Sequence, residues 1–238
     1  CSGAILMEAY HPPVYTRFTR PVLRIVFRGI FHLMSEVVIT GRGHVPTEGA
    51  YILAINHISL YEAPLVVAFW PQPPEVAGAA DVWNRPGQSL LARAYGGLPI
   101  HRGEYDRRVL ELILSALHSG YPLLLAPEGT RSHQPGMSRA KPGIAYLMDK
   151  AQVPVVPVGV VGTTEDLVHR ALRLQRPKLE IHIGAPLDLP PVEGRGRARR
   201  EARQENADRV MAHIAALLPP DYRGVYAPQA EQILDSGL

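Results

Sequence analysis

The segment YILAINHISLYE, residues 51–62, changes from apolar to polar halfway along its length. Residues 51–55 suit a buried strand, and a polar turn at residues 56–60 leads into a short apolar helix over residues 61–69. A strand that opens into a polar loop before a helix is the unit from which α/β domains are built. Ligands in such domains bind at the loops that follow the carboxyl ends of the strands. The segment therefore predicts an α/β fold with a functional site just after its strand.

Apolar runs of the same kind recur on both sides of this segment and alternate with helical patterns. Further strands are expected at residues 36–40, 98–102, 122–126, 153–161 and 178–183. Helices are expected at residues 90–95, 105–119 and 197–218. This alternation favours a single α/β domain with a mostly parallel or mixed central sheet flanked by helices.

Three parts are expected along the chain. Residues 1–36 form a basic amphipathic segment that associates with a membrane, and residues 37–226 form the α/β domain. Residues 227–238 show little periodicity, so a loosely held tail is expected there.

Positive charge is concentrated near the beginning of the chain. The formal net charge is +3, and residues 1–44 hold five arginines against two glutamates, which is also +3. The body of the chain is therefore close to neutral, and it has no aromatic platform for bases, which argues against a nucleic acid partner. A basic start on a neutral body favours attraction to an anionic membrane surface.

A mostly apolar helix is expected at residues 21–34, because Pro21 suits a first helical turn. Arg24, Arg28 and His32 are four residues apart and share one stripe of this helix. A helix of this length spans about 21 Å, less than the roughly 30 Å of a bilayer core. Two interpretations stand: an interfacial helix with its arginines at the headgroups, or a helix packed on the core with one solvated edge. The first places the protein at the cytoplasmic face of the cell membrane, as a peripheral or monotopic protein.

His57 stands in the polar turn of the opening segment, five residues before Glu62. A histidine can act as a general base near neutral pH, and a carboxylate bonded to its ring fixes the tautomer and stabilises the imidazolium. Glu62 lies on the first turn of the predicted helix, from which its carboxylate can turn back toward the ring. On its own this spacing is weak evidence, because such pairs also occur incidentally at surfaces.

Three further blocks follow along the chain: GGLPIHR at residues 96–102, PEGTRS at residues 127–132 and VPVVPV at residues 153–158. Arg131 in the second of these offers a planar fork of donors that suits a phosphate. Arg102 ends a short predicted strand and is a candidate for the same role. VPVVPV by itself is better explained as a core or edge strand.

Together and in this order, the four blocks resemble the glycerolipid acyltransferase family, whose best-known members are the 1-acylglycerol-3-phosphate acyltransferases. NHISLYE resembles the family's N-H-x4-D motif, and GGLPIHR resembles its G-x-I-x-x-x-R block. APEGTRS and VPVVPV resemble its F-P-E-G-T-R-S and V-P-x-x-P-V blocks. The resemblance covers residues 37–218, and it implies that residues 37–226 are an acyltransferase domain.

This resemblance implies a catalytic pair in which His57 removes the proton of the acceptor hydroxyl and Glu62 orients His57. The acceptor then attacks the thioester directly, without an acyl-enzyme intermediate. Arginines and a lysine are expected to clamp the acceptor phosphate, and the PEGT turn is expected to shape the acceptor pocket. An asparagine side chain or neighbouring backbone N–H groups are expected to support the oxyanion. The substrate-binding residues implied are Asn56, Arg102, Glu128, Gly129, Thr130, Arg131 and Lys141.

The donor implied by the resemblance is acyl-CoA or acyl-carrier protein, and the leading acceptor is a lysophosphatidate-type glycerophospholipid. Glycerol-3-phosphate, another lysophospholipid or a glycolipid are alternative acceptors. No metal and no cofactor are expected. The sequence departs from the family at two positions, with Glu62 in place of the aspartate and Ala126 in place of the phenylalanine.

Three other functions compete with this one. A serine hydrolase needs a G-x-S-x-G elbow, which the sequence lacks, although Ser59 lies close to His57. A metal hydrolase would show H-E-x-x-H or clustered ligands, whereas the ten histidines here are scattered. A non-catalytic lipid-binding module would leave the ordered histidine and arginine loops unexplained.

Overall fold

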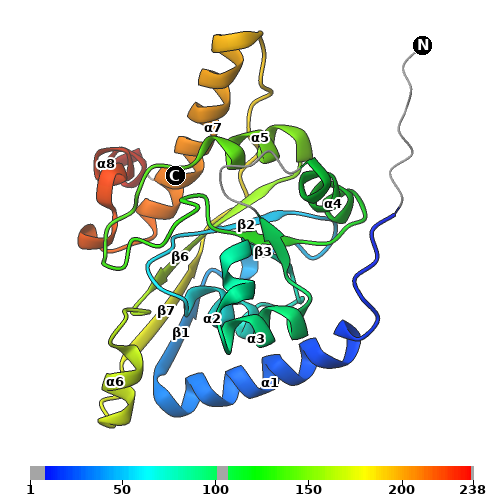
Figure 1. The fold of residues 1–238 in the computed structure, drawn as a ribbon. Coiled ribbons are helices and arrows are strands. Elements are labelled where there is room, and N and C mark those ends of the chain that lie inside the picture. Colours follow the sequence, from blue (N-terminus) through cyan, green and yellow to red (C-terminus); the bar gives the residue numbers. More distant parts are fainter. Residues whose placement is uncertain (1–8, 101–106, 237–238) are drawn as a thin grey trace.

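The computed structural model describes residues 9–100 and 107–236, and its centre is a seven-stranded sheet covered by helices on both faces (Figure 1). The strands lie in the order β1-β7-β6-β2-β5-β3-β4. Every neighbouring pair is parallel except β6 and β7, which are antiparallel. The strands are β1 (Glu36–Thr40), β2 (Ile52–Ile55), β3 (Glu75–Ala79), β4 (Leu98–Ile100), β5 (Leu123–Leu125), β6 (Val155–Val161) and β7 (Lys178–Ile183). The predicted mixed α/β sheet is therefore confirmed.

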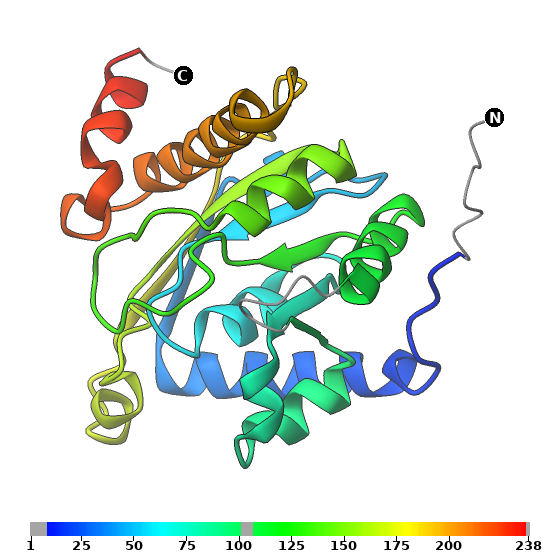
Figure 2. The same ribbon diagram turned by 45° about the horizontal axis from the view of Figure 1, so that its top comes forward.

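Helices divide between the two faces, as Figure 2 also shows. Below the sheet in Figure 1 lie α1 (Thr16–Met34), α2 (Glu62–Phe69) and α3 (Gln88–Tyr95). Above it lie α4 (Arg107–His118), α5 (Pro142–Ala151) and α7 (Gly196–Ala216), with α8 (Ala227–Ser236) packed beside α7. The short helix α6 (Leu167–Leu172) projects at one edge. Short 3-10 helices occur at Arg42–His44, Ala80–Asn84, Pro220–Tyr222 and Gly224–Tyr226.

Strand β2 runs through the middle of the sheet and has all four residues buried. Ile52 and Ala54 pack into the core under α4, α5 and α7, whereas Leu53 and Ile55 pack into the core under α1 and α2. Successive side chains of a strand point to opposite faces, so a strand covered on both sides is apolar throughout. This explains why the opening segment has no alternation before its polar turn.

Four elements were missed or misjudged from the sequence. Strand β3 has the sequence EVAGA, and alanine, glycine and glutamate are all poor strand formers, so its pairing with β4 and β5 determines it. Helices α5 and α6 were also not expected. The predicted loose tail is wrong, because residues 227–236 form α8, whose Ala230 is fully buried beside α7.

Helix α1 begins five residues earlier than expected, so Pro21 lies inside the helix rather than at its first turn. Its basic stripe faces the protein. Arg24 donates to the carbonyl oxygens of Val67 and Trp70, and Arg28 donates to that of Ala68. These carbonyls belong to the last turn of α2 and its cap, where unpaired acceptors attract cations.

Arg20 fixes the first half of α1 to the sheet through a buried ion pair. Its two terminal nitrogens donate to the two carboxylate oxygens of Glu75 at 2.7 and 2.6 Å, and its Nε donates to the Tyr95 carbonyl at 2.9 Å. The Tyr10 hydroxyl donates to the same carboxylate at 2.9 Å. Both ion-pair side chains are almost completely buried, so removing one partner would leave an uncompensated charge.

The opposite side of α1 exposes an apolar stripe, which includes Phe18, Val22, Ile25 and Leu33. The helix packs on the core with one side solvated, as the second interpretation expected, but the arginines bind the protein and the solvated side is apolar. Among the described residues, no helix is both long enough and apolar enough to span a bilayer.

Candidate active site

The site lies where two neighbouring parallel strands end. Strands β2 and β5 pair in register from Ile52 with Leu123 to Ala54 with Leu125, so their carboxyl ends meet at one edge of the sheet. The loop after β2 carries His57, and the loop after β5 carries the PEGTRS block. Parallel pairing thus brings together two blocks that are about seventy residues apart, as expected of an α/β domain.

His57 and Glu62 form the pair that the sequence predicted. The ring Nδ1 of His57 lies 3.0 Å from Oε2 of Glu62. Glu62 is fully buried, whereas 21% of the His57 side chain is exposed. A carboxylate can only accept, so Nδ1 carries the proton and Nε2 presents a lone pair. Within the described parts of the chain, Nε2 makes no hydrogen bond, and it is the atom that can receive a substrate proton.

Glu62 is held by three further donor groups from two residues, Ser59 and Thr163. The backbone N–H of Ser59 donates to it at 2.9 Å, and the hydroxyls of Ser59 and Thr163 donate to Oε1 at 3.1 and 2.6 Å. The Ser59 hydroxyl in turn accepts from the N–H of Tyr61 at 3.1 Å. The Glu62 carboxylate thus bonds back to the Ser59 N–H, as the glutamate of an S-x-x-E capping box does, whereas the Ser59 hydroxyl accepts from Tyr61 and not from the N–H of Glu62. Glu62 therefore both begins α2 and orients His57.

Glu128 lies on the other side of His57 and holds its backbone rather than its ring. Oε1 accepts from the His57 N–H at 2.9 Å, and Oε2 accepts from the Ser138 N–H at 2.7 Å. The residue is 1% exposed. Burial raises the pKa of the Glu128 carboxyl above its ordinary value, and the two N–H groups partly oppose this rise. Both oxygens of the side chain are thus occupied by the protein.

Two backbone hydrogen bonds tie the PEGTRS loop to the histidine loop. The N–H of Ser132 donates to the His57 carbonyl at 3.0 Å, and the N–H of His133 donates to the Ile58 carbonyl at 3.0 Å. Arg131 and Thr130 directly precede this junction, and Arg131 is partly exposed. Its guanidinium makes no hydrogen bond to any described residue, so a cation lies near the His57–Glu62 pair with its donors unused by the described protein.

Gly129 and Lys141 lie against each other at the same edge. Gly129 has φ +65°, and a Cβ placed there would come within 3.0 Å of Lys141 Cγ. The backbone conformation therefore favours glycine, and a larger residue would also require the Lys141 side chain to shift. The N–H of Lys141 donates to the Pro127 carbonyl at 2.9 Å, which leaves its exposed side chain running over the turn.

Asn56 does not have the role expected for it. Its side-chain nitrogen donates to the Val160 carbonyl at 2.9 Å, and its side-chain oxygen accepts from the Val160 N–H at 2.7 Å. The residue is 1% exposed and joins the end of β2 to β6. We therefore correct its assignment from oxyanion support to positioning of the histidine loop. Arg102 lies outside the described residues.

Several residues of the site were not recognised in the sequence. Thr163, which bonds Glu62, follows the carboxyl end of β6, the strand that neighbours β2. A polar residue at that position could have been suspected from the predicted strand alone. Tyr222 and Tyr226 support the loop between the PEGTRS block and α5 from far along the chain, through Met137 and Ala140. No local sequence pattern indicates these last contacts.

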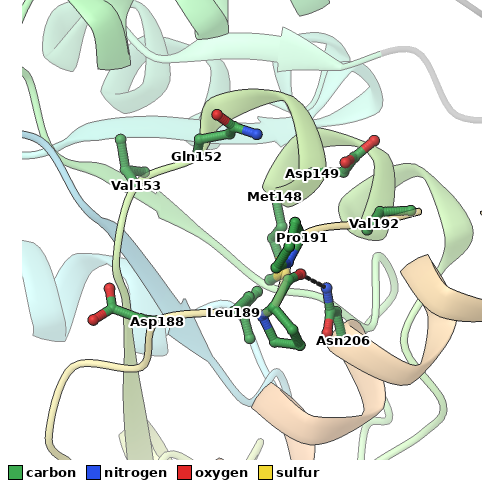
Figure 3. Close-up of a pocket in the computed structure, with 10 residues that line it drawn as sticks. Met148, Asp149, Gln152, Val153, Asp188, Leu189, Pro191, Val192 and Asn206 are labelled. Carbon is green, nitrogen blue, oxygen red and sulfur yellow. Dashed lines mark hydrogen bonds between the residues drawn. The ribbon is translucent and has the colours of Figure 1, made fainter.

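A pocket beside α5 lies away from this site. It lies between α5, the segment before α7 and α7 itself, where Figure 3 shows Asp149, Pro191 and Asn206 among the lining residues. The side-chain nitrogen of Asn206 donates to the Pro190 carbonyl at 2.8 Å. Val153, at its wall, precedes β6, whereas His57 follows β2. Because β2 and β6 are parallel, the pocket and His57 lie at opposite ends of the sheet.

Comparison with known proteins agrees with this geometry. An acyltransferase family model matches residues 36–161, more than half of the chain. The chain is similar to the lyso-ornithine lipid O-acyltransferase of Pseudomonas aeruginosa, with 29% identity over 63% of this chain and 63% of that one. It is also similar to 1-acyl-sn-glycerol-3-phosphate acyltransferase alpha of Bos taurus, with 24% identity over 74% of this chain and 61% of that one. The chain thus spans less than two thirds of the length of these curated relatives.

A solved structure shares the fold. The crystal structure of PlsC, the 1-acyl-sn-glycerophosphate acyltransferase of Thermotoga maritima, superposes with a TM-score of 0.60 and 23% identity, covering 82% of this chain and 78% of that one.

Fold and site together define an α/β protein with a histidine–carboxylate pair at the carboxyl edge of its sheet. The chain belongs to the acyltransferase family, and the resemblance to glycerolipid acyltransferases inferred from its four blocks is confirmed.

Proposed function

We propose that this chain transfers a fatty acyl group from a thioester donor to the hydroxyl of a lysophospholipid-type acceptor at a membrane surface. The observation that carries the proposal is the His57–Glu62 pair, with Nδ1 bonded to a buried carboxylate and Nε2 free to accept a proton. Family membership supports acyl transfer as the reaction.

In the proposed reaction, Nε2 of His57 takes the proton of the acceptor hydroxyl as its oxygen attacks the thioester carbonyl carbon. The tetrahedral intermediate collapses, the carbon–sulfur bond breaks, and the leaving thiolate takes the proton from His57. The ester and the free thiol are the products. Glu62 stabilises the imidazolium during the step and keeps its ring oriented.

Arg131 and Lys141 are proposed to bind the acceptor phosphate, with Arg102 as a third contributor from the family pattern. Support comes from the position of Arg131, one residue before the backbone junction with His57. The exposed side chain of Lys141 runs over Gly129 at the same edge. Gly129 and Thr130 shape the turn that these cations share. Glu128 is proposed to position His57 rather than to contact substrate, because both of its oxygens already accept backbone N–H groups.

Ser59 does not favour the rival serine hydrolase. Its hydroxyl donates to Glu62 and accepts from the Tyr61 N–H, and the residue is 2% exposed. A nucleophilic serine would instead bond the free nitrogen of the histidine. We therefore retain direct transfer without an acyl-enzyme.

The outer face of α1 supports a location at the membrane surface, which we propose to be the cytoplasmic face of the cell membrane. Phe18, Val22, Ile25 and Leu33 are all exposed on this one helix, and apolar residues gathered in this way mark protein or membrane interaction sites. In this placement the apolar side chains, and not the basic stripe, meet the lipid.

The function is tested by mass-spectrometric assay of purified protein with acyl-CoA or acyl-carrier protein as donor. Lysophosphatidate and lyso-ornithine lipid are the first two acceptors, because relatives named for each match this chain. We expect acylated product with at least one acceptor and a loss of about 10²–10⁴-fold in kcat/KM for His57→Ala. Near-full turnover in that variant, or hydrolysis of donor without acylated product, would contradict the proposal.

A further inference from the structure

The turn between α6 and β7 exposes two leucines to solvent. Leu172 is 78% exposed and Leu174 is 87% exposed. We call residues 172–176 the leucine tip. In Figure 1 the tip belongs to the short helix that projects at the lower left, away from both cores of the domain. Leucines exposed singly are ordinary, but two at the end of a projecting helix form a protruding apolar point.

The backbone of the tip makes this exposure unusual. The N–H of Gln175 donates to the Arg170 carbonyl at 3.1 Å, and the N–H of Leu174 donates to the Ala171 carbonyl at 2.8 Å. These two bonds define a Schellman motif, in which Leu174 occupies the position that is usually glycine. Its φ is +57°, a conformation that leucine adopts reluctantly because its Cβ crowds the backbone. The sequence thus keeps a leucine at a position where glycine would be less strained, although its side chain packs against nothing.

Positive charge surrounds the tip. Residues 168–178 contain no acidic residue and include Arg170, Arg173, Arg176 and Lys178. Arg173, Arg176 and Lys178 are exposed. The acidic groups that face this region are Glu165 and Asp166 just before α6, Glu36, which is the register partner of Lys178 on β1, and Glu180, which pairs with Lys178 at 3.2 Å. An apolar point ringed by arginines matches the boundary between acyl chains and anionic headgroups.

The tip is held next to α1. Arg176 donates to the carbonyl oxygens of His32 at 3.1 Å and Ser35 at 3.4 Å, at the end of that helix. The N–H of Glu36 donates to the Pro177 carbonyl at 3.1 Å. Figures 1 and 2 both show α6 beside the last turn of α1. The exposed Leu33 of α1 and the leucine tip therefore lie at the same corner of the molecule.

We propose that the leucine tip is a second lipid-inserting element, which enters the same anionic bilayer surface as the apolar stripe of α1. This inference rests on the proposed membrane location. A single helix lying on a membrane leaves the protein free to roll about the helix axis. A second contact beyond the end of that helix restricts this rolling and fixes the height and direction of the His57 edge relative to the lipid.

The test compares partitioning onto vesicles of phosphatidylcholine with and without phosphatidylglycerol. Leu172→Ser/Leu174→Ser is expected to weaken partitioning onto anionic vesicles by at least about tenfold, since two leucine side chains no longer leave water. Arg173→Glu is expected to weaken binding only where phosphatidylglycerol is present. The matched control is Leu234→Ser on α8, which replaces a leucine that is 49% exposed on the other side of the sheet from α1.

Insertion itself is measured with an environment-sensitive fluorophore on Leu174→Cys in a Cys1→Ser background. We expect a blue shift on addition of anionic vesicles, whereas a label on Leu234→Cys does not respond. Equal partitioning of wild type and the double serine variant, with no shift at position 174, would overturn the inference. The inference would also be overturned if the wild-type protein did not partition onto vesicles of either composition.

The proposed acyltransferase activity can be tested separately from the membrane-binding role of the leucine tip. Activity on detergent-dispersed acceptor does not depend on the tip, so the double serine variant is expected to match wild type there. Loss of activity in detergent would assign the leucines to the enzyme's substrate site and overturn a purely membrane-binding role. A change in oligomeric state without a change in vesicle binding would instead show that the tip binds a second copy of the chain.

Discussion

Two histidine–glutamate pairs lie in the region of this site. The pair with the shorter distance between nitrogen and oxygen is the more exposed one, and it is the less suited to general-base catalysis. Nδ1 of His57 lies 3.0 Å from Glu62, whereas Nδ1 of His133 lies 2.6 Å from Glu165. Glu62 is fully buried, but His133 and Glu165 are each 59% exposed. Exposed pairs of this kind contribute about 0–1 kcal/mol, because water competes for both partners. Distance alone therefore does not define a catalytic pair.

The surroundings of each carboxylate separate the two pairs. Glu62 accepts from Ser59 and Thr163 as well as from His57, so its position is fixed before substrate arrives. Glu165 has His133 as its only hydrogen-bond partner among the described residues. A carboxylate that is fixed and shielded from water can hold one tautomer of its histidine, and this preorganisation is what general-base catalysis requires.

The largest effect on kcat/KM is expected when the charge of the buried Glu62 is removed, and the same change at the exposed Glu165 serves as its control. Glu62→Gln places an amide beside Nδ1 and favours the tautomer that carries its proton on Nε2, which can no longer accept from the acceptor hydroxyl. We expect kcat/KM to fall at least about a hundredfold. Glu165→Gln is the matched control and is expected to change kcat/KM less than about twofold. Steady-state assays of both variants decide this. Comparable losses in the two would mean that burial does not distinguish the pairs.

Sequence patterns predicted the strand–loop–helix unit around His57 because that unit is local. The apolar run, the polar turn and the first turn of the helix all lie within twelve residues, and the five-residue spacing of His57 and Glu62 lies inside the same stretch. Thr163 could not be assigned in the same way, since its approach to Glu62 depends on β6 pairing with β2. The four motif blocks indicated the family, but only the pairing of β2 with β5 brings the histidine loop and the PEGTRS loop together.

Helix α1 shows where periodicity stops being informative. The four-residue spacing of Arg24, Arg28 and His32 predicted one stripe correctly, yet spacing does not say what that stripe faces. In the structure, carbonyl oxygens at the end of α2 accept hydrogen bonds from Arg24 and Arg28. These contacts leave the apolar stripe of α1 facing outward. The net charge of residues 1–44 therefore overstated the exposed charge, because Arg20, Arg24 and Arg28 are bound to the protein.

A smaller effect is expected when the Glu62 side chain is shortened. Glu62→Asp restores the family's usual residue but withdraws the carboxylate by one methylene group. Ser59 and Thr163 donate to the longer side chain, so the aspartate cannot satisfy both and reach His57. We expect kcat/KM to fall about tenfold, and the free energy of unfolding to fall by about 1–3 kcal/mol because a buried donor is left unpaired. Urea titration and kinetics measure these two effects.

Activity that persists or rises in the aspartate variant would contradict this expectation. It would show that the loop after β2 shifts to bring the shorter carboxylate into place. Thr163→Val serves as the companion variant, since it removes one donor to Glu62 without changing the carboxylate. We expect Glu62→Asp to lower the free energy of unfolding by more than Thr163→Val does. The valine variant has no hydroxyl at this position, so it leaves no buried donor unpaired.

The smallest effect concerns Glu128, the carboxylate that holds the His57 backbone. Burial raises the pKa of this group, so the folded state favours its protonated form more than the unfolded chain does. The stabilisation linked to this group is then fully present below its ordinary pKa of 4.5 and is lost as the pH rises through the raised value. Glu128→Gln cannot titrate. The difference in unfolding free energy, wild type minus variant, should therefore decrease as the pH rises.

Urea titrations of both proteins at several pH values between about 4 and 8 measure this difference. All other titrating groups occur in both proteins, so their contributions cancel to the extent that they are not coupled to Glu128. A difference that instead grows with pH would mean that the N–H bonds from His57 and Ser138 favour the ionised carboxylate by more than burial disfavours it. Glu128 would then be a carboxylate that the fold holds in its charged form.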